Sequence, residues 1–182
     1  MPVSIHRLDN SSWGFASSCF VCEETNSAGM RVPFFHDDEM GTVSAEFSLD
    51  EQFSGAPSYV HGGLVLAILD EAMAWAAIAV AKTFALTRTT TTTFSRPVKV
   101  GRSYRVEARI MGPPPQQGPS ALLSGSGELV HADIEACALI TRGTDGKTCA
   151  EAVAMFAALS SAQSSDAIGA SVQGADAGYL RA

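Results

Sequence analysis

The clearest pattern along the chain is an apolar run, Leu64–Ala81, in which the only charged residues are Asp70 and Glu71. Its length and composition predict a long helix, from about Gly63 to Lys82. A helix that is apolar on all sides is normally buried. A buried carboxylate costs free energy unless it is paired, hydrogen-bonded or protonated. The two acids therefore indicate a functional site within a core helix.

Strands are predicted on both sides of this helix. Residues 103–111 alternate apolar and charged positions, as a half-buried strand does, and the threonine-rich segment 87–94 favours a strand over a helix. The predicted strands are residues 31–36, 42–48, 87–94, 103–111, 130–140 and 149–159. Two strands, one helix and four strands predict an α+β fold, in which an antiparallel sheet wraps around one long helix.

Composition predicts a single domain. The chain has 182 residues, of which 46% are apolar and 17% charged, and this excludes global disorder. We expect a leader at 1–12, the domain at 13–159 and a low-complexity tail at 160–182. The segment Gly112–Gly127, rich in proline and glycine, is expected to be a long loop, or a loop that contains a short strand.

No membrane span is expected, because two adjacent acids in the middle of the apolar run would be costly in lipid. The first residues contain no apolar run of the kind found in signal peptides. Four cysteines without a secretory signal favour the cytoplasm.

The start of the predicted helix, His61-Gly62-Gly63, has the chemistry of a carbonyl-binding site. Glycines let backbone N–H groups approach a ligand closely, and a helix N-terminus offers unpaired N–H groups at the positive end of its dipole. Asp70 follows Gly63 by about two turns, so both fall near one face. The terminus can polarise a carbonyl oxygen, and the carboxylate can act on the carbonyl carbon or on a water beside it.

The segment from His61 to Glu71 resembles the active-site helix of the hotdog-fold acyl-CoA thioesterases of the PaaI-like (phenylacetic acid degradation) group. The resemblance covers residues 13–159. Three further motifs fall in the family's order: Cys19-Phe20-Val21-Cys22 followed by Asn26 and Gly29-Met30, Arg96-Pro97-Val98-Lys99-Val100-Gly101, and Asp145-Gly146-Lys147. The chain departs from the family at Glu23, which replaces a glycine, and at the long segment 112–127, which replaces a short hairpin.

The resemblance implies a hotdog fold of about six strands, assembled as a homodimer or homotetramer, with the active site at the dimer interface. It implies hydrolysis of an acyl-CoA thioester without a cofactor. The family's catalytic acid lies nine positions after the motif histidine, which selects Asp70. Neighbouring helical residues point about 100° apart, so Glu71 is expected to bond to the backbone or to a basic residue at the interface, and to lie among the substrate-binding residues.

The other site residues carry smaller roles in this prediction. Gly63 is expected to donate its N–H to the thioester carbonyl, with Gly62 beside it against the substrate. His61 either belongs to the catalytic site or fixes the loop before the helix through backbone hydrogen bonds. One of the threonines at 89–93, a run centred on Thr91, is expected to hold the substrate or the water.

Charge is unevenly distributed. The formal net charge of −7 disfavours nucleic acid as a partner, yet seven of the twelve basic residues fall between positions 82 and 109, where Glu107 alone opposes them. One interpretation is that they lie on solvated strand faces. The functional interpretation is that Arg96 and Arg102 meet the phosphates of coenzyme A.

Other chemistries fit the sequence less well. Cys19 and Cys22 have the spacing of zinc ligands, but Cys137 and Cys149 form no second close pair, so no metal site is expected. Neither a Gly-x-Ser-x-Gly elbow nor a phosphate-binding loop is present. Two alternatives stay open: a non-catalytic acyl-CoA-binding hotdog protein, and a hotdog enoyl-CoA hydratase or dehydratase, in which the acid would precede the histidine.

Overall fold

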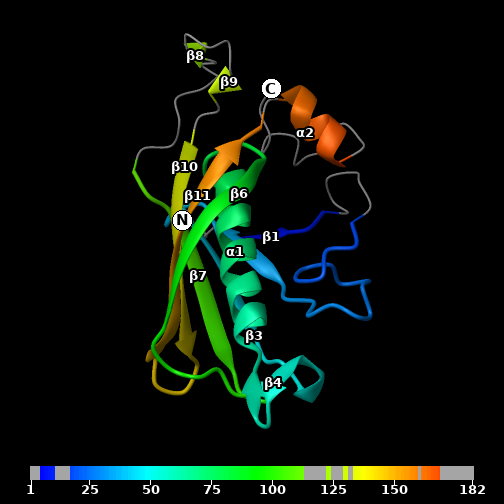
Figure 1. Ribbon diagram of the computed structural model, residues 1–182, viewed down its shortest axis with the longest axis vertical. Coiled ribbons are helices and arrows are strands. Elements are labelled where there is room, and N and C mark those ends of the chain that lie inside the picture. Colours follow the sequence, from blue (N-terminus) through cyan, green and yellow to red (C-terminus); the bar gives the residue numbers. More distant parts are fainter. Residues whose placement is uncertain are drawn as a thin grey trace.

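The computed structural model describes residues 5–10, 17–112, 122–123, 129–130, 133–159 and 161–168. A seven-stranded antiparallel sheet dominates the fold, in the order β1-β2-β3-β7-β10-β11-β6 (Figure 1). Its strands are β1 (Ile5–Leu8), β2 (Phe34–Asp37), β3 (Thr42–Phe47), β6 (Ala85–Phe94), β7 (Tyr104–Ile110), β10 (Asp133–Arg142) and β11 (Thr148–Ala158). Every pairing within the sheet is antiparallel.

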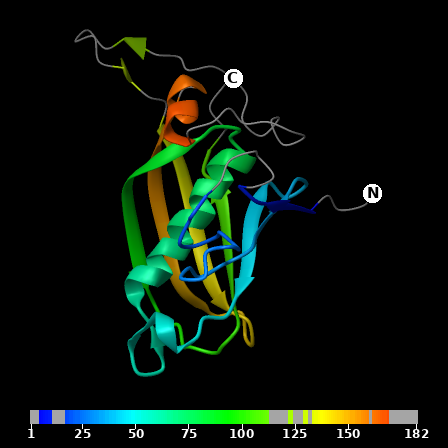
Figure 2. The same cartoon turned by 90° about the vertical axis from the view of Figure 1, so that its right-hand side faces the viewer.

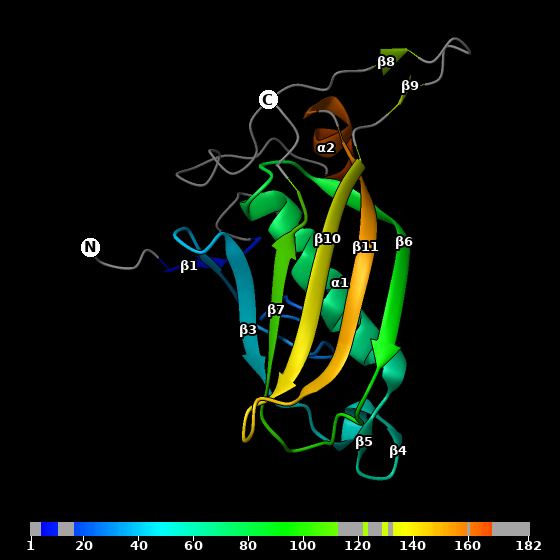
Figure 3. The same ribbon diagram turned by 90° about the vertical axis from the view of Figure 1, so that its left-hand side faces the viewer.

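The long helix α1 (Gly62–Ala79) lies along one face of this sheet, and the strands curve around it (Figure 3). Ten of its residues are buried, including Ile68, Met73 and Trp75. The facing positions of β7 and β10 are buried too, since Val106, Ala108 and their neighbours alternate inward. Within the described residues α1 is long and apolar enough to span a membrane by composition alone. Its packing inside the sheet accounts for that composition.

The segment before β2 covers the side of α1 that the sheet leaves open (Figure 2). Its turns are closed by backbone hydrogen bonds, from Met30 N to Phe20 O at 2.7 Å and from Val32 N to Val21 O at 2.8 Å. Val21 and Met30 are buried within the main core. The middle of α1 therefore lies between the sheet and this N-terminal segment.

Three short elements complete the described chain. A hairpin of β4 (Ser54–Ala56) and β5 (Tyr59–Val60), preceded by a 3-10 turn at Glu51–Phe53, leads directly into α1. The two-residue strands β8 (Leu122–Leu123) and β9 (Leu129–Val130) pair with each other. Helix α2 (Ser161–Ile168) follows β11.

The predicted α+β hotdog architecture is confirmed, with seven strands in the sheet where about six were expected. The extra strand is β1, which comes from the expected leader and pairs with β2. The expected tail begins with α2, a helix that apolar periodicity did not indicate. Helix α1 ends at Ala79, three residues before the predicted end, and Lys82 just beyond it adopts a positive φ of 58°. Asp9 and Asn10 of the expected leader follow β1 and line a pocket with Cys22, and the remaining residues of the leader and tail lie outside the described residues.

Candidate active site

His61 caps the N-terminus of α1. Its Nδ1 accepts a hydrogen bond from the Gly63 N–H at 2.9 Å, and its backbone carbonyl accepts from Leu64 at 2.9 Å and Val65 at 3.2 Å. These bonds satisfy N–H groups that a helix start leaves without partners. The imidazole thus makes the contact with the helix entry that the second of its two predicted roles requires, and its membership of the catalytic site stays a prediction. The Gly63 N–H, the predicted carbonyl donor, is held by the imidazole in the free chain.

Gly55 in strand β4 is a further part of this site that the sequence did not reveal. A Cβ added there would lie 2.9 Å from His61 Cα and 2.9 Å from a ring carbon of the same residue. Only glycine lets the hairpin approach the helix cap so closely. Nothing local in the sequence shows which residue Gly55 faces.

Asp70 lies two turns further along α1, beside strand β6. Its Oδ1 accepts a hydrogen bond from the Thr87 hydroxyl at 2.8 Å. Burial raises the pKa of Asp70, and the hydrogen bond from Thr87 opposes that shift. Among the described residues, Asp70 forms no ion pair with a strand arginine, so a buried salt bridge does not account for the carboxylate.

Glu71, the next residue, points away from β6 toward the N-terminal segment that covers the other side of the helix. Its Oε1 accepts a hydrogen bond from the Cys19 thiol at 3.4 Å. Burial, reinforced by the nearby Cys19, raises the pKa of Glu71 to about 8. Glu71 was expected to meet the backbone or a basic residue. Within the described chain its partners are cysteines of the N-terminal segment.

Asp70 and Gly63 cannot reach one carbonyl group from the same helix. Seven residues at 1.5 Å each separate them by about 10 Å along the helix axis. A carbonyl donor and an attacking group must each lie about 3 Å from the reacting atoms. The two groups therefore serve one thioester only if they come from two copies of the chain.

Thr91 and Thr87 lie on opposite faces of β6. Thr91 pairs with Val153, which is 41% exposed, whereas the adjacent Thr90 and Thr92 pair with the buried Ala154 and Ala152. Side chains alternate along a strand, so Thr91 faces away from α1. A register shift at Met155/Phe156 places Thr87 opposite the buried Phe156, on the helix side. Thr87 is the hydroxyl that sequence analysis missed.

The predicted phosphate-binding arginines lie in different surroundings. Arg102 lines a surface pocket together with Lys99 and Arg142. Lys99 pairs with Tyr59 of β5 and its Nζ lies 5.8 Å from the Tyr59 ring centroid, which places the pocket next to the hairpin that enters α1. Arg96 is exposed, and its Nη1 donates to the Thr148 carbonyl at 2.7 Å. Arg142, which is distant in the sequence, adds a third cation to the pocket of Lys99 and Arg102.

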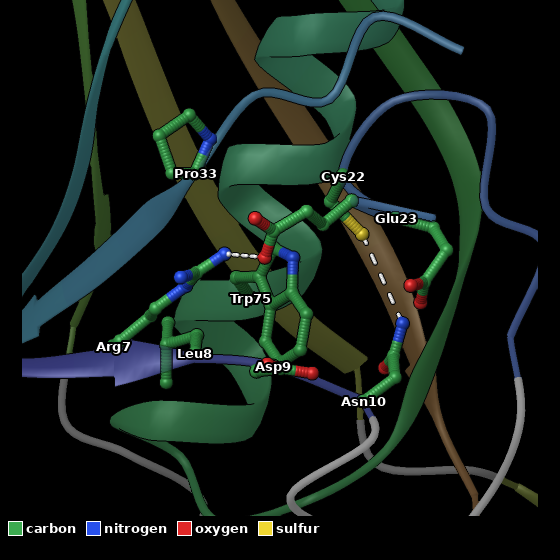
Figure 4. A pocket seen from close by; sticks show the side chains of 9 residues that line it. Arg7, Leu8, Asp9, Asn10, Cys22, Glu23, Pro33 and Trp75 are labelled. Atoms are coloured by element: carbon green, nitrogen blue, oxygen red, sulfur yellow. Dashed lines mark hydrogen bonds and ion pairs between the residues drawn. The ribbon is translucent and has the colours of Figure 1, made fainter. Parts of the chain in front are cut away.

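A second, smaller pocket lies beneath the N-terminal segment (Figure 4). Trp75 of α1 forms part of its wall, and the Asn10 amide donates to Cys22 Sγ at 3.8 Å. Hydrogen bonds from the Cys22 side chain and from backbone N–H groups lower the pKa of Cys19 to about 5. The same thiol–thiol hydrogen bond, together with burial, raises the pKa of Cys22. The pocket thus borders Cys22, whose thiol is hydrogen-bonded to that of Cys19.

Residues 58–112 match the family model of the thioesterase superfamily. This match spans β5, α1, β6 and β7, and so contains Gly63 and Asp70. Comparison with curated protein sequences gives no match. The resemblance to hotdog-fold thioesterases that the sequence indicated is confirmed.

Solved structures share the fold at low sequence identity. A crystal structure described as a thioesterase superfamily protein is 20% identical, with a TM-score of 0.62 over 76% of this chain. The chain spans 59% of the length of that protein. The E. coli PaaI protein from the phenylacetic acid degradation operon is 18% identical, with a TM-score of 0.56 over 72% of this chain and 81% of PaaI. A Streptococcus mutans protein solved with acetyl CoA is 13% identical, with a TM-score of 0.52 over 65% of this chain and 82% of that protein.

Proposed function

We propose that this chain, a hotdog-fold protein of the thioesterase superfamily, hydrolyses acyl-CoA thioesters to the free acid and coenzyme A. The observation that carries the proposal is Asp70: a partly buried carboxylate on an apolar helix, held by Thr87 and without a basic partner among the described residues. Such a group is costly to keep for stability alone. A similar fold bound to acetyl CoA in the Streptococcus mutans protein supports the choice of thioester.

The substrate carbonyl takes the place of His61 at the Gly63 N–H. That N–H, at the positive end of the α1 dipole, stabilises the oxyanion of the tetrahedral intermediate. A preorganised donor of this kind contributes about 3–4 kcal/mol to the transition state. The imidazole is exposed, so it has room to turn away when the thioester binds.

Asp70 supplies the second half of the chemistry. As a general base it takes a proton from water while the water oxygen bonds to the carbonyl carbon; the C–S bond then breaks and Asp70 returns the proton to the departing thiolate. As a nucleophile its oxygen displaces the thiolate to form a mixed anhydride, which water cleaves. Thr87 orients the carboxylate on either route. Oxygen-18 found in Asp70 after a single turnover in labelled water would identify the nucleophilic route, because label enters Asp70 only when water attacks the aspartyl carbonyl of the anhydride.

The site requires two subunits. Because about 10 Å separates Gly63 from Asp70 along one helix, we propose that Gly63 of one subunit faces Asp70 of its partner in a homodimer. Strand β6 supports this arrangement: among the described strands it is the last of the sheet and pairs with β11 alone, so its other edge can pair with a second copy. Further pairing into a homotetramer is compatible with the same site.

The nucleotide of coenzyme A binds at the basic pocket formed by Lys99, Arg102 and Arg142. These three cations lie beside the hairpin that leads to Gly63, so the phosphates would sit near the carbonyl site. Hydrolysis at this site needs no cofactor, and the protein acts in the cytoplasm.

Hydrolysis of a panel of acyl-CoAs, with release of free thiol as the readout, tests the activity directly. We expect turnover of at least one member and its loss in Asp70→Asn. Tight binding of the panel without thiol release would instead identify a non-catalytic acyl-CoA-binding protein. Hydration of an enoyl-CoA without thiol release would identify a hydratase.

A further inference from the structure

The N-terminal segment and helix α1 bring together three side chains that ligate metals. The Sγ atoms of Cys19 and Cys22 and a carboxylate oxygen of Glu71 all lie within 4.8 Å of one another. The Cys19 thiol and Glu71 Oε1 are already 3.4 Å apart. We propose that Cys19, Cys22 and Glu71 form a binding site for a thiophilic divalent cation, with zinc as the best fit.

The spacing suits a tetrahedral ion. Zinc binds sulfur at about 2.3 Å and carboxylate oxygen at about 2.0–2.2 Å, so its ligand atoms lie about 3.4–3.8 Å from each other. Ligand atoms within 4.8 Å of one another reach these separations by small side-chain shifts. Two thiolates and one carboxylate select zinc over magnesium or calcium, which prefer oxygen ligands alone.

Each of the two cysteine sulfurs already accepts a hydrogen bond that holds it in place. Cys22 N donates to Cys19 Sγ at 3.4 Å, and the Asn10 amide donates to Cys22 Sγ at 3.8 Å. Both sulfurs thus have an N–H donor, which favours the thiolate that a metal needs. Gly29 closes the same loop: a Cβ there would lie 2.6 Å from the Phe20 carbonyl.

Charge gives an independent reason for a cation. Glu71 lies between α1 and its N-terminal cover, and no Lys, Arg or His of the described chain forms an ion pair with it. An ionised Glu71 would lack a counter-charge within the described chain, and buried charges are normally paired or bound to a metal. A divalent cation supplies that charge and links the N-terminal segment to the helix turn that carries Asp70.

The sequence did not indicate this site, because it offers no second close pair of ligands beside Cys19 and Cys22. The third ligand comes from a helix that starts forty residues after Cys22, where spacing rules do not reach. Three protein ligands leave one position of a tetrahedral ion for water or another donor. The proposal does not depend on the thioesterase activity.

Cobalt binding tests the site. Reduced protein, stripped of metal with a chelator, is titrated with Co²⁺ under argon. We expect one equivalent per chain to produce thiolate-to-cobalt charge-transfer absorption and the visible bands of tetrahedral cobalt, and Zn²⁺ to displace it. Cys19→Ser and Cys22→Ser should each abolish the charge-transfer signal of the paired thiolates. Glu71→Gln should raise the dissociation constant at least about tenfold.

The matched control is Cys137→Ser, which removes a partly exposed thiol in β10 and should leave cobalt binding unchanged. A second measurement needs no variant: Zn²⁺ should protect Cys19 and Cys22 of the wild-type protein from alkylation, but not Cys137, as read by peptide mass spectrometry. Absence of stoichiometric binding to the reduced protein, or equal alkylation with and without Zn²⁺, would overturn the proposal. A Cys19–Cys22 disulfide whose reduction restores no metal binding would replace it with a redox pair.

Discussion

At the scale of single residues, Asp70 carries the largest predicted effect. Asp70→Asn keeps the shape of the side chain and an acceptor for Thr87, but removes the base or nucleophile. We expect normal folding and a loss of kcat of about 10²–10⁴-fold, the usual contribution of a positioned acid or base. Thiol release from the best acyl-CoA of the panel measures it. Wild-type turnover in Asp70→Asn, combined with loss in Glu71→Gln, would transfer the role to Glu71.

Thr87 is a positioning residue, and its substitution should separate kcat from KM. Thr87→Val is nearly isosteric and removes the hydroxyl that donates to Asp70 at 2.8 Å. We expect kcat to fall about tenfold, equivalent to the roughly 1.4 kcal/mol of one hydrogen bond to a charged group, while KM stays within about twofold. Thr93→Val, at an exposed position of the same strand, is the matched control. Equal losses in both variants would mean that β6 itself is disturbed.

His36 makes stability depend on pH. Its side chain is 4% exposed, and burial lowers its pKa, assisted by Lys82 and His6 and opposed by Asp38. The unfolded chain therefore binds the proton more readily than the folded one. The free energy of unfolding should be unaffected by this group above about pH 6.5 and should decrease as the pH falls below it.

Urea unfolding at pH 7.5 and pH 5.5 measures this dependence. We expect His36→Gln to lose less stability than the wild type between the two pH values. His6→Gln, which changes an exposed imidazole, should still lose stability toward pH 5.5, but less than the wild type, because His6 helps to lower the pKa of His36. The same decrease in His36→Gln as in the wild type would exclude His36 as its source.

The residue-level contacts mark the limit of sequence reasoning here. Asp70 could be found because a carboxylate inside an apolar run is conspicuous, and because the family's spacing pointed to it. Thr87, Gly55 and the Cys19–Glu71 contact depend on which elements meet in space. A threonine in a run of threonines, or a glycine in a loop, carries no local signal of its partner.

At the scale of elements, the helices and strands that could be predicted from the sequence are those with a strong periodicity of apolar residues. Helix α1 and the central strands β7, β10 and β11 are long and half or fully buried, so burial imposes their patterns. Strand β1 has four residues, three of them exposed, and is a strand because it pairs with β2. Helix α2 has no acidic residue in its first turn and no basic residue in its last turn, so its ends carry no charge signal in the sequence. Pairing with β2, not local preference, determines β1.

The basic pocket belongs to this scale, since β10, β7 and the loop before β7 each contribute to it. Charge reversal by Arg102→Glu should raise KM for an acyl-CoA several-fold and leave kcat largely unchanged, which indicates uniform binding. A short thioester without the nucleotide should show little change. Added salt should weaken acyl-CoA binding more in the wild type than in the variant.

Arg105→Glu is the matched control for that prediction, because it makes the same charge change at an exposed position of β7 that is paired with Glu107. Its KM should remain near the wild-type value. Equal increases in KM for both substrates in Arg102→Glu would show that Arg102 supports the fold or the dimer instead of the nucleotide.

At the scale of the whole molecule, the separation of Gly63 and Asp70 becomes a prediction about assembly. An isologous dimer has two equivalent sites, each with Gly63 from one subunit and Asp70 from the other. Asp70→Asn inactivates one half of each site. Gly63→Pro inactivates the other half, because proline lacks the N–H yet is accepted in the first turn of a helix.

Co-expression of the two variants with different tags therefore tests the shared site. Each heterodimer contains one site with both residues intact and one with neither, so statistical mixing should restore about a quarter of wild-type activity per chain. The purified heterodimer should reach about half, and two differently tagged Asp70→Asn chains should restore none. If each site lay within one chain, every site in the mixture would lack a residue, and mixing would restore no activity. Full activity of a species with monomeric mass by light scattering would contradict the dimer itself.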